Sequence, residues 1–311
     1  SVTTDTIFSF EGPMTQNADT LNTLHTRAGF IAALDQSGGS TPKALKGYGI
    51  EADAFSNDDE MFALIHQMRA RIISSPSFTG DEILGAILFE KTMDGQVGGK
   101  PTPTALLDKG IQPFIKIDKG LEDEANGVQM MKPIPGLDDL LARAAKLGVV
   151  GTKERSVINL ANRDGIAAIV KQQFEVAEQV SKHGLVAIIE PEVNIKSPER
   201  AEADAILKDE LLKALDAMTA DDKVMLKLSI PAQPGLYDAL VDHPRVVRVV
   251  ALSGGFSRAE ACAELAKNRG MIASFSRALL SDLRAQMSDA EFDAALGEAI
   301  DEIYAASTQK V

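Results

Sequence analysis

The sequence has few of the residues that build disulfides or zinc sites. Its 311 residues include one cysteine, Cys262, so no disulfide can form within the chain and no thiolate metal cage can be assembled. The four histidines, His25, His66, His183 and His243, are scattered, which argues against a zinc site built on a histidine cluster. The single cysteine suits a protein of the reducing cytoplasm.

Long apolar segments and an excess of positive charge are also lacking. No run approaches the roughly 18 apolar residues of a membrane span, and residues 1–7 do not resemble a secretory signal. The formal net charge of −13 repels nucleic acid and anionic membranes, so neither is an expected partner. A phosphorylated substrate would also be repelled unless the mouth of its site gathers cations.

The chain does contain eight short apolar runs separated by longer amphipathic stretches. These runs cover residues 29–35, 83–90, 113–118, 149–155, 186–192, 224–229, 246–253 and 271–277. Such runs, bounded by turn residues, are typical of buried parallel strands, and eight of them predict an α/β fold, the (β/α)8 barrel. Most runs end at charged or hydroxyl-bearing residues, where such barrels carry their reactive groups.

Apolar periodicity predicts the helices and the domain organisation. We expect an N-terminal arm with a short helix in residues 1–28, and in residues 29–311 a single barrel domain with an extra C-terminal helix. Helices are expected at residues 17–26, 58–73, 137–146, 166–183, 198–218, 257–268, 278–287 and 289–306, and a long loop at 92–107. Ser288 and Glu291 predict a capping box for the last helix.

Charged residues two positions apart on a strand share one face. Three consecutive runs each carry such a pair: Lys116 with Asp118, Lys153 with Arg155, and Glu190 with Glu192. On the outer face these charges would lie beneath helices at a heavy cost in desolvation. We therefore expect them inside the barrel mouth, where Asp35 joins them in a ring of three cations and four carboxylates.

Lys227 lies in the middle of an apolar run, between Leu226 and Leu228. One interpretation is structural, an ion pair with a carboxylate such as Glu190. The other is that desolvation and a neighbouring cation, Lys153, lower its pKa so that the free amine attacks a carbonyl. The nearby carboxylate pair can supply the proton transfers of Schiff-base chemistry, which favours the nucleophile.

Two glycine-rich turns are candidates for binding phosphate. Ser253, Gly254 and Gly255 follow the seventh run before a predicted helix, and Arg277 ends the eighth run. Backbone N–H groups at such a turn bind anions, and the turns after strands seven and eight often hold phosphate in barrels. Arg277 can add a bidentate contact.

The second turn, residues 35–43, offers the hydroxyls of Ser37 and Ser40 and the cation of Lys43. Its structural interpretation is a strand-to-helix turn capped by Ser40, with Pro42 in the first helical turn. Two anion-binding turns on one rim suggest a substrate with phosphate at both ends.

Seven segments in this order resemble class I fructose-1,6-bisphosphate aldolases, most closely the bacterial form. They are Ala-Leu-Asp35-Gln-Ser-Gly-Gly-Ser, Ile-Lys116-Ile-Asp118-Lys-Gly, Lys153-Glu-Arg155, Ile-Glu190-Pro-Glu192, Leu-Lys227, Leu-Ser253-Gly-Gly and Ser274-Phe-Ser-Arg277-Ala. The resemblance runs from Gly29 to Ala278. It implies a glycolytic carbon–carbon lyase that cleaves fructose 1,6-bisphosphate reversibly to dihydroxyacetone phosphate and glyceraldehyde 3-phosphate, through a Schiff base and without a metal or other cofactor.

The resemblance also implies roles for single residues. Lys227 would form the Schiff base, and Glu190 would act as acid and base during carbinolamine formation and dehydration. Lys153 would stabilise charge, Asp35 would take the proton of the C4 hydroxyl, and Glu192 would orient the lysines.

For the phosphates, the resemblance implies two groups of ligands. The C1 phosphate would be bound by Ser253, Gly254 and Arg277, with Gly255 in the same turn. The C6 phosphate would lie towards Ser37, Ser40, Lys43, Lys116 and Arg155.

Two departures and two rivals accompany this interpretation. Vertebrate relatives end in a mobile tail with a terminal tyrosine, whereas Tyr304 here lies in the predicted last helix, and Ala44 stands where they have a basic residue. A Schiff-base lyase acting on tagatose bisphosphate or a deoxy-sugar phosphate, and a catalytically silent sugar-phosphate binder, are the alternatives. The oligomeric state is left open, a homo-oligomer included.

Overall fold

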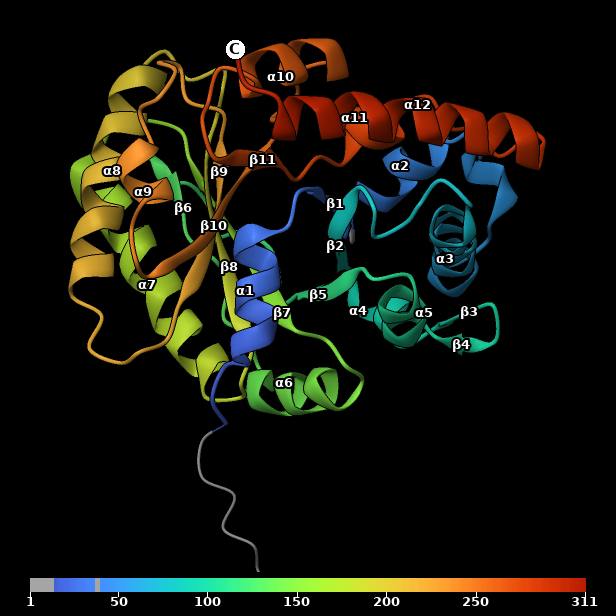
Figure 1. Ribbon diagram of the computed structural model, residues 1–311, viewed down its shortest axis with the longest axis horizontal. Coiled ribbons are helices and arrows are strands. Elements are labelled where there is room, and N and C mark those ends of the chain that lie inside the picture. Colours follow the sequence, from blue (N-terminus) through green and yellow to red (C-terminus); the bar gives the residue numbers. More distant parts are fainter. Residues whose placement is uncertain (1–13, 37–39) are drawn as a thin grey trace, which may run out of the picture.

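The computed structural model describes residues 14–36 and 40–311, and eight parallel strands form its centre (Figure 1). They are β1 (Phe30–Leu34), β2 (Ile83–Leu88), β5 (Gln112–Lys116), β7 (Gly151–Ile158), β8 (Val186–Val193), β9 (Val224–Ser229), β10 (Val246–Leu252) and β11 (Met271–Ala273). They lie side by side in chain order. Each predicted run overlaps one of these strands.

The sheet closes where β11 meets β1, a junction we call the closing seam. The backbone N–H of Ala33 in β1 donates a hydrogen bond of 3.1 Å to the carbonyl of Phe275, just beyond β11. Together with the parallel order this makes a nearly closed barrel, and the predicted (β/α)8 fold is confirmed.

Helices surround the barrel, and the longer ones lie where the periodicity predicts. The longer ones are α1 (Ala18–Thr26), α3 (Asp58–Ser74), α6 (Leu137–Lys146), α7 (Arg163–Ser181), α8 (Arg200–Asp216), α10 (Arg258–Leu265) and α12 (Asp289–Thr308). The shorter ones are α2 (Thr41–Gly47), α4 (Glu90–Met93), α5 (Thr102–Asp108), α9 (Asp238–Val241) and α11 (Arg277–Leu280), with a 3-10 turn at Ala52–Ala54. The capping box of Ser288 and Glu291 on α12 is confirmed.

Two local predictions are wrong. Residues 92–107 are not a loop, because they hold the end of α4, the antiparallel pair β3 (Gln96–Val97) and β4 (Lys100–Pro101), and most of α5. Their Gly and Pro residues mark turns between short elements, with Pro103 in the first turn of α5. The helix expected at 278–287 ends at Leu280. A further short strand, β6 (Val128–Gln129), pairs with the end of β7.

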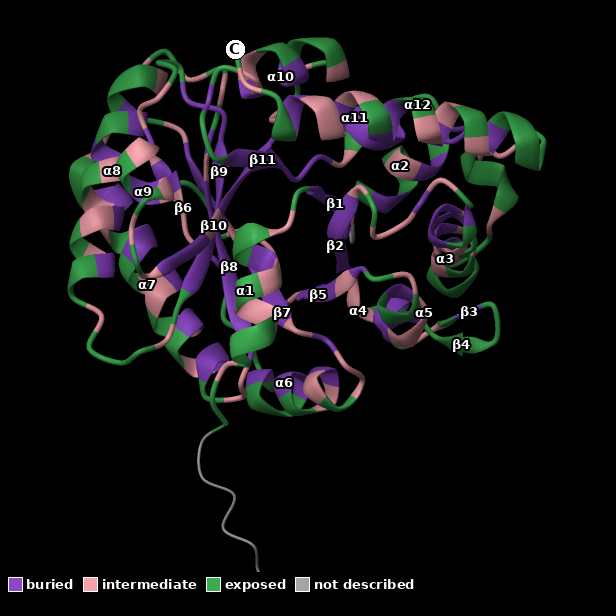
Figure 2. Cartoon of the chain, in the orientation of Figure 1, coloured by how far each residue is buried: buried purple, intermediate pink, exposed green. Residues whose placement is uncertain are grey.

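The core has two apolar layers. One fills the barrel with side chains from alternate strand positions, among them Ile31, Phe114, Ile188, Met225, Val250 and Ile272. The larger layer lies between the strands and the helices. Figure 2 shows the strands buried and the outward helix faces exposed. This alternation decides which polar side chains enter the barrel.

The amino end of the barrel is plugged by α1. Leu24 belongs to the interior layer, and the guanidinium of Arg248, early in β10, donates to the carbonyls of Leu24 and His25 at 3.1 and 2.7 Å. Because this end is covered, the carboxyl ends of the strands provide the mouth. The predicted domain boundary at residue 28 stays a prediction. No helix in the described part of the chain has the length and apolarity needed to span a membrane.

One buried charge faces the helices instead of the mouth. Glu154 follows Lys153 on β7, so its side chain lies on the opposite face of the strand. Ser156 shares the face of Glu154 and accepts a hydrogen bond from the side-chain amide of Gln173 in α7. The side chain is 0% exposed, and neither carboxylate oxygen has a hydrogen-bond partner among the described residues. Burial raises the pKa of Glu154 well above its usual range, and the charge of Asp118 adds to this.

This raised pKa predicts a pH-dependent loss of stability that Glu154→Gln removes. Above a pH of about 4.5 the unfolded chain loses this proton while the folded chain keeps it, so the wild type loses roughly 1.4 kcal/mol of stability per pH unit up to the folded pKa. The stability advantage of the variant over the wild type should therefore grow with pH. Urea unfolding at pH 5, 6, 7 and 8 measures it, with exposed Glu175→Gln on α7 as control. A constant difference between Glu154→Gln and the wild type would contradict this account.

Candidate active site

Charged residues replace the interior apolar layer at the carboxyl ends of the strands. On three strands an interior apolar residue is followed two positions later by a charged one: Phe114 by Lys116, Ile188 by Glu190, and Met225 by Lys227. Strand alternation therefore directs these side chains into the barrel, as the sequence predicts. The site lies at the open end, opposite α1.

Lys153 joins two carboxylates from other strands. Its Nζ lies 2.7 Å from Oδ2 of Asp35 and 3.1 Å from Oε1 of Glu190, and the three side chains are 5–9% exposed. We call these residues the Lys153 cluster. Burial alone would raise the pKa of Asp35, but the charges of Lys153 and Lys227 outweigh it and lower that pKa to about 2. Asp35 is thus an ionised carboxylate at neutral pH.

The pKa values of Lys153 and Glu190 also shift so that each side chain stays charged. Burial opposes the charge of Lys153, yet Asp35 and Glu190 raise its pKa above the ordinary value. Burial likewise opposes ionisation of Glu190, and Lys153 and Lys227 reverse the effect and lower its pKa. The three charges are therefore stable in the interior only as a set.

Lys227 lies beside this cluster and differs from Lys153. It is 4% exposed, and it forms no ion pair with any carboxylate among the described residues. Burial lowers its pKa and the charge of Lys153 lowers it further, against the opposing carboxylates of Glu190, Asp35 and Glu192. The structural interpretation required an ion pair with Glu190, and Glu190 instead pairs with Lys153. The free amine is thereby favoured at Lys227.

A second group of charges lies nearer the rim. Arg155 pairs with Glu192 at 2.5 Å, and its backbone N–H donates to Oδ2 of Asp118 at 3.1 Å. Lys116 lies 3.6 Å from Asp118. The structure thus brings together all seven charges of the predicted ring. Glu192 forms its ion pair with a guanidinium, not with a lysine.

The turn after β10 has the geometry of an anion-binding loop. Gly254 and Gly255 have φ angles of 63° and 102°, which favour glycine, and the N–H of Phe256 donates to the carbonyl of Ser253 at 3.0 Å. Helix α10 begins at Arg258, and the side chain of Ser257 caps its N-terminus. Arg277 is exposed at the start of α11.

The turn after β1 is described in part. Ser37 lies outside the described residues. Ser40 and Lys43 are exposed at the start of α2, and Ser40 holds the N-cap position without a side-chain capping bond. The expected capping role of the Ser40 hydroxyl is therefore wrong, whereas Pro42 does lie in the first helical turn.

Sequence reasoning missed several polar residues around the site. Arg69 is 0% exposed on α3, where its Nη1 donates to Oγ1 of Thr92 at 3.1 Å and its Nη2 to the carbonyl of Gln36. The side-chain amide of Gln36 donates to Oγ of Ser276. In the sequence, Arg69 could be recognised only by its position beside the core residues of an amphipathic helix.

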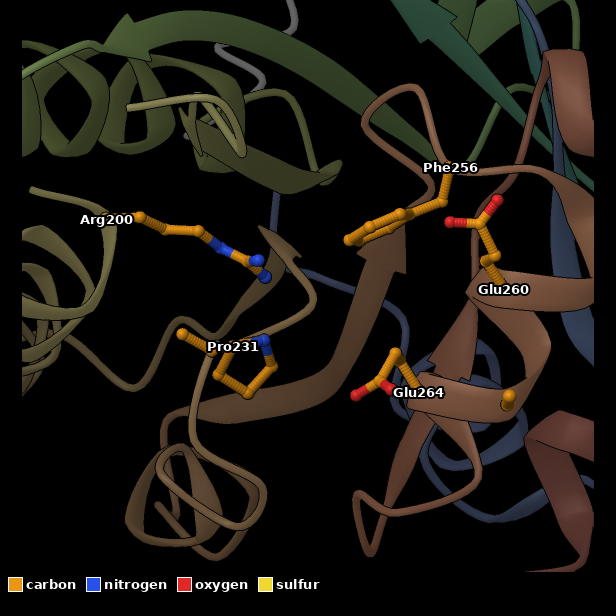
Figure 3. A pocket seen from close by; sticks show the side chains of 7 residues that line it. Arg200, Pro231, Phe256, Glu260 and Glu264 are labelled. Carbon is orange, nitrogen blue, oxygen red and sulfur yellow. The ribbon is translucent and has the colours of Figure 1, made fainter. Parts of the chain in front are cut away.

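A hollow of about 390 Å³ lies beside the Ser253 turn and outside the charged ring (Figure 3). Its lining comprises Arg200, Pro231, Ala232, Phe256, Glu260, Ala263 and Glu264. Figure 3 shows Arg200 directed towards the ring of Phe256, whose centroid lies 5.7 Å from the guanidinium carbon. The hollow contains none of the predicted site residues.

Among the described residues, no group of three or more His, Cys, Asp or Glu side chains could hold a metal ion.

Comparison with known proteins agrees with this geometry. A family model described as "Glycolytic: Fructose-bisphosphate aldolase class-I" matches residues 17–232, more than half of the chain. A fructose-bisphosphate aldolase from Plasmodium falciparum superposes with a TM-score of 0.75 at 21% identity, covering 95% of this chain and 97% of that one. Cgl0159 from Corynebacterium glutamicum superposes at 0.51 and 13% identity, covering 93% and 91%. The two structures show the shared fold, and the family model shows that this chain belongs to the class I fructose-bisphosphate aldolase family.

Proposed function

We propose that Lys227 forms the Schiff base through which this aldolase cleaves fructose 1,6-bisphosphate to dihydroxyacetone phosphate and glyceraldehyde 3-phosphate. The observation that carries the assignment is a buried amine of lowered pKa that has no ion pair and lies beside the Lys153 cluster. An amine must be uncharged to attack a ketone. Desolvation and the charge of Lys153 supply that condition.

Imine formation needs an acid and a base near Lys227. Its Nζ adds to the C2 carbonyl, and a proton moves from nitrogen to oxygen to give the carbinolamine. Glu190, whose charge acts on Lys227, accepts the ammonium proton of Lys227 as the free amine forms and then gives a proton to the C2 hydroxyl, which leaves as water. The resulting iminium draws electrons from the C3–C4 bond more strongly than a carbonyl does.

Cleavage needs a base at the C4 hydroxyl. Asp35 is ionised and held by Lys153 at 2.7 Å, so we assign it that proton. As the C3–C4 bond breaks, its electrons move into an enamine and the aldehyde leaves. Protonation at C3 and addition of water to the iminium then release dihydroxyacetone phosphate and the free Lys227 amine.

Protonation at C3 requires a group inside the barrel mouth. The last residues of the chain pack far from the mouth, since Lys310 Nζ donates to the carbonyl of Met271, the first residue of β11, at 2.7 Å. Tyr304 lies within α12, six residues before Lys310. We assign to Glu190, whose charge acts on Lys227, the transfer of a proton from solvent to C3.

The two phosphates extend towards the two turns of the rim. Ser253, Gly254, Gly255 and Arg277 form the proposed C1 site, and Ser37, Ser40, Lys43, Lys116 and Arg155 the proposed C6 site. The cations of these turns supply the local attraction that a chain of net charge −13 otherwise lacks. We place the enzyme in the cytoplasm, where its glycolytic substrate occurs, and expect no nucleic-acid or membrane partner.

Replacing the proposed nucleophile should abolish covalent trapping. Dihydroxyacetone phosphate with borohydride should add one covalent adduct to the wild type, mapped by mass spectrometry to the peptide containing Lys227. Lys227→Met should gain no mass and retain its circular dichroism, while the exposed-lysine control Lys171→Met on α7 should be labelled normally. Full activity of Lys227→Met would refute the assignment. An unlabelled wild type would favour the silent binder, and relative rates on fructose and tagatose bisphosphates would identify the sugar.

Removing the charge of Lys153 should move imine formation to higher pH. That charge lowers the pKa of Lys227, so Lys153→Met should raise this pKa and reduce the free amine at neutral pH. The acid limb of the trapping rate, measured with cyanoborohydride, should shift upward, whereas Lys153→Arg, which keeps the charge, should remain near the wild type. An unshifted limb in Lys153→Met would sink the electrostatic argument.

Arg277→Ala tests the phosphate assignment. The KM for fructose 1,6-bisphosphate should rise roughly 10- to 100-fold, because a hydrogen bond to a charged group contributes about 1.5–3 kcal/mol. Arg284, an exposed arginine between α11 and α12, is the control when changed to alanine and should leave KM unchanged. An unchanged KM in Arg277→Ala would remove that residue from the phosphate site.

A further inference from the structure

Side chains at the closing seam join two turns that both belong to the proposed site. Gln36 directly follows Asp35, and its side-chain amide donates a hydrogen bond to Oγ of Ser276. Ser276 directly precedes Arg277 and holds the N-cap position of α11. The two hydrogen-bonded side chains are therefore each one residue from a group assigned to the substrate.

Behind this contact lies Arg69, which anchors the same turn from the helix layer. Figure 1 shows α3 on the side of the barrel formed by β1 and β2. Arg69 donates to the backbone carbonyl of Gln36 and to Oγ1 of Thr92, and its guanidinium carbon lies 5.8 Å from the ring centroid of Phe89. It is 0% exposed and forms no ion pair among the described residues. A buried guanidinium costs free energy unless it is compensated, and these hydrogen bonds together with the charge of Asp35 provide that compensation.

The two turns have few other links. The β1 and β2 strands share a continuous ladder from Phe30 to Leu34, whereas β11 is three residues long and no ladder is assigned between it and β1 in the described chain. The backbone hydrogen bond between Ala33 and Phe275 lies below the mouth. The bond between Gln36 and Ser276 lies further along both chains, at the level of the functional groups.

We propose that Arg69, Gln36 and Ser276 form a positioning relay that fixes Asp35 and Arg277 relative to each other across the closing seam. The inference rests on the proposed function, which assigns Asp35 to the C4 hydroxyl and Arg277 to the C1 phosphate. Cleavage of the bisphosphate needs both groups in register on one substrate. Dihydroxyacetone phosphate lacks the C4 hydroxyl and needs only the second group, so the relay acts on cleavage more than on trapping.

The test compares these two reactions in the full-length protein. Gln36→Ala and Ser276→Ala should each lower kcat for fructose 1,6-bisphosphate cleavage roughly tenfold, while the half-saturating concentration of dihydroxyacetone phosphate in borohydride trapping changes less than threefold. The double variant should be no worse than the more impaired single variant, because both changes break the same link. Ser276→Thr retains the hydroxyl and should retain kcat, and exposed Ser281→Ala at the end of α11 is the neutral control.

The outcomes separate the relay from the proposed function. Equal losses in cleavage and trapping, additive losses in the double variant, or wild-type kcat in both single variants would each overturn the relay. All of these presuppose that the wild type is trapped at Lys227, and an untrapped wild type would instead overturn the proposed function. Arg69→Lys keeps the charge but cannot make both planar contacts, and it should lower cleavage selectively as Gln36→Ala does. Equal loss of cleavage and trapping in this variant also counts against the relay.

Discussion

The ammonium of Lys153 is the charge on which the rest of the site depends. It lies between carboxylates from the first and fifth strands of the barrel, at 2.7 Å from Asp35 and 3.1 Å from Glu190. None of these groups could remain charged at such burial alone, and together they do. The same charge repels the ammonium of Lys227. One buried cation therefore keeps two acids ionised and favours the neutral form of the neighbouring amine.

The barrel explains why this cluster forms from distant residues. Parallel strands present alternate residues to the interior, and one further step along each strand leads from apolar filling to the open mouth. Met225 and Lys227 occupy two such successive positions on β9. Because α1 plugs the amino end through Leu24, water and substrate reach the interior from the carboxyl end, where the charged residues lie.

The alternation that builds the barrel is also what makes much of it predictable from sequence. The eight strands and the ring of seven charges follow from runs and two-residue spacing, which are local patterns. The contacts of Arg69 and Gln36 could not be predicted, because they join α3, β1 and β11 through tertiary packing with no shared period. Glu154 was missed for a related reason: its face was predictable, but its lack of any partner depends on what the helix above it offers. Residues 92–107 show the limit of composition, since Gly and Pro can separate short elements as well as form a loop.

Barrel closure and catalysis meet at one place. A chain that winds once around a barrel must bring its first and last strands together, and here the last strand is the shortest of the eight. Asp35 and Arg277, both of which we assign to the substrate, follow these two strands, so a bisphosphate bound to both would itself bridge the closing seam. Ligand that binds only the closed arrangement stabilises it in proportion to its concentration. Side-chain contacts such as that of Gln36 with Ser276 hold the arrangement before substrate arrives, which reduces the ordering that binding must supply.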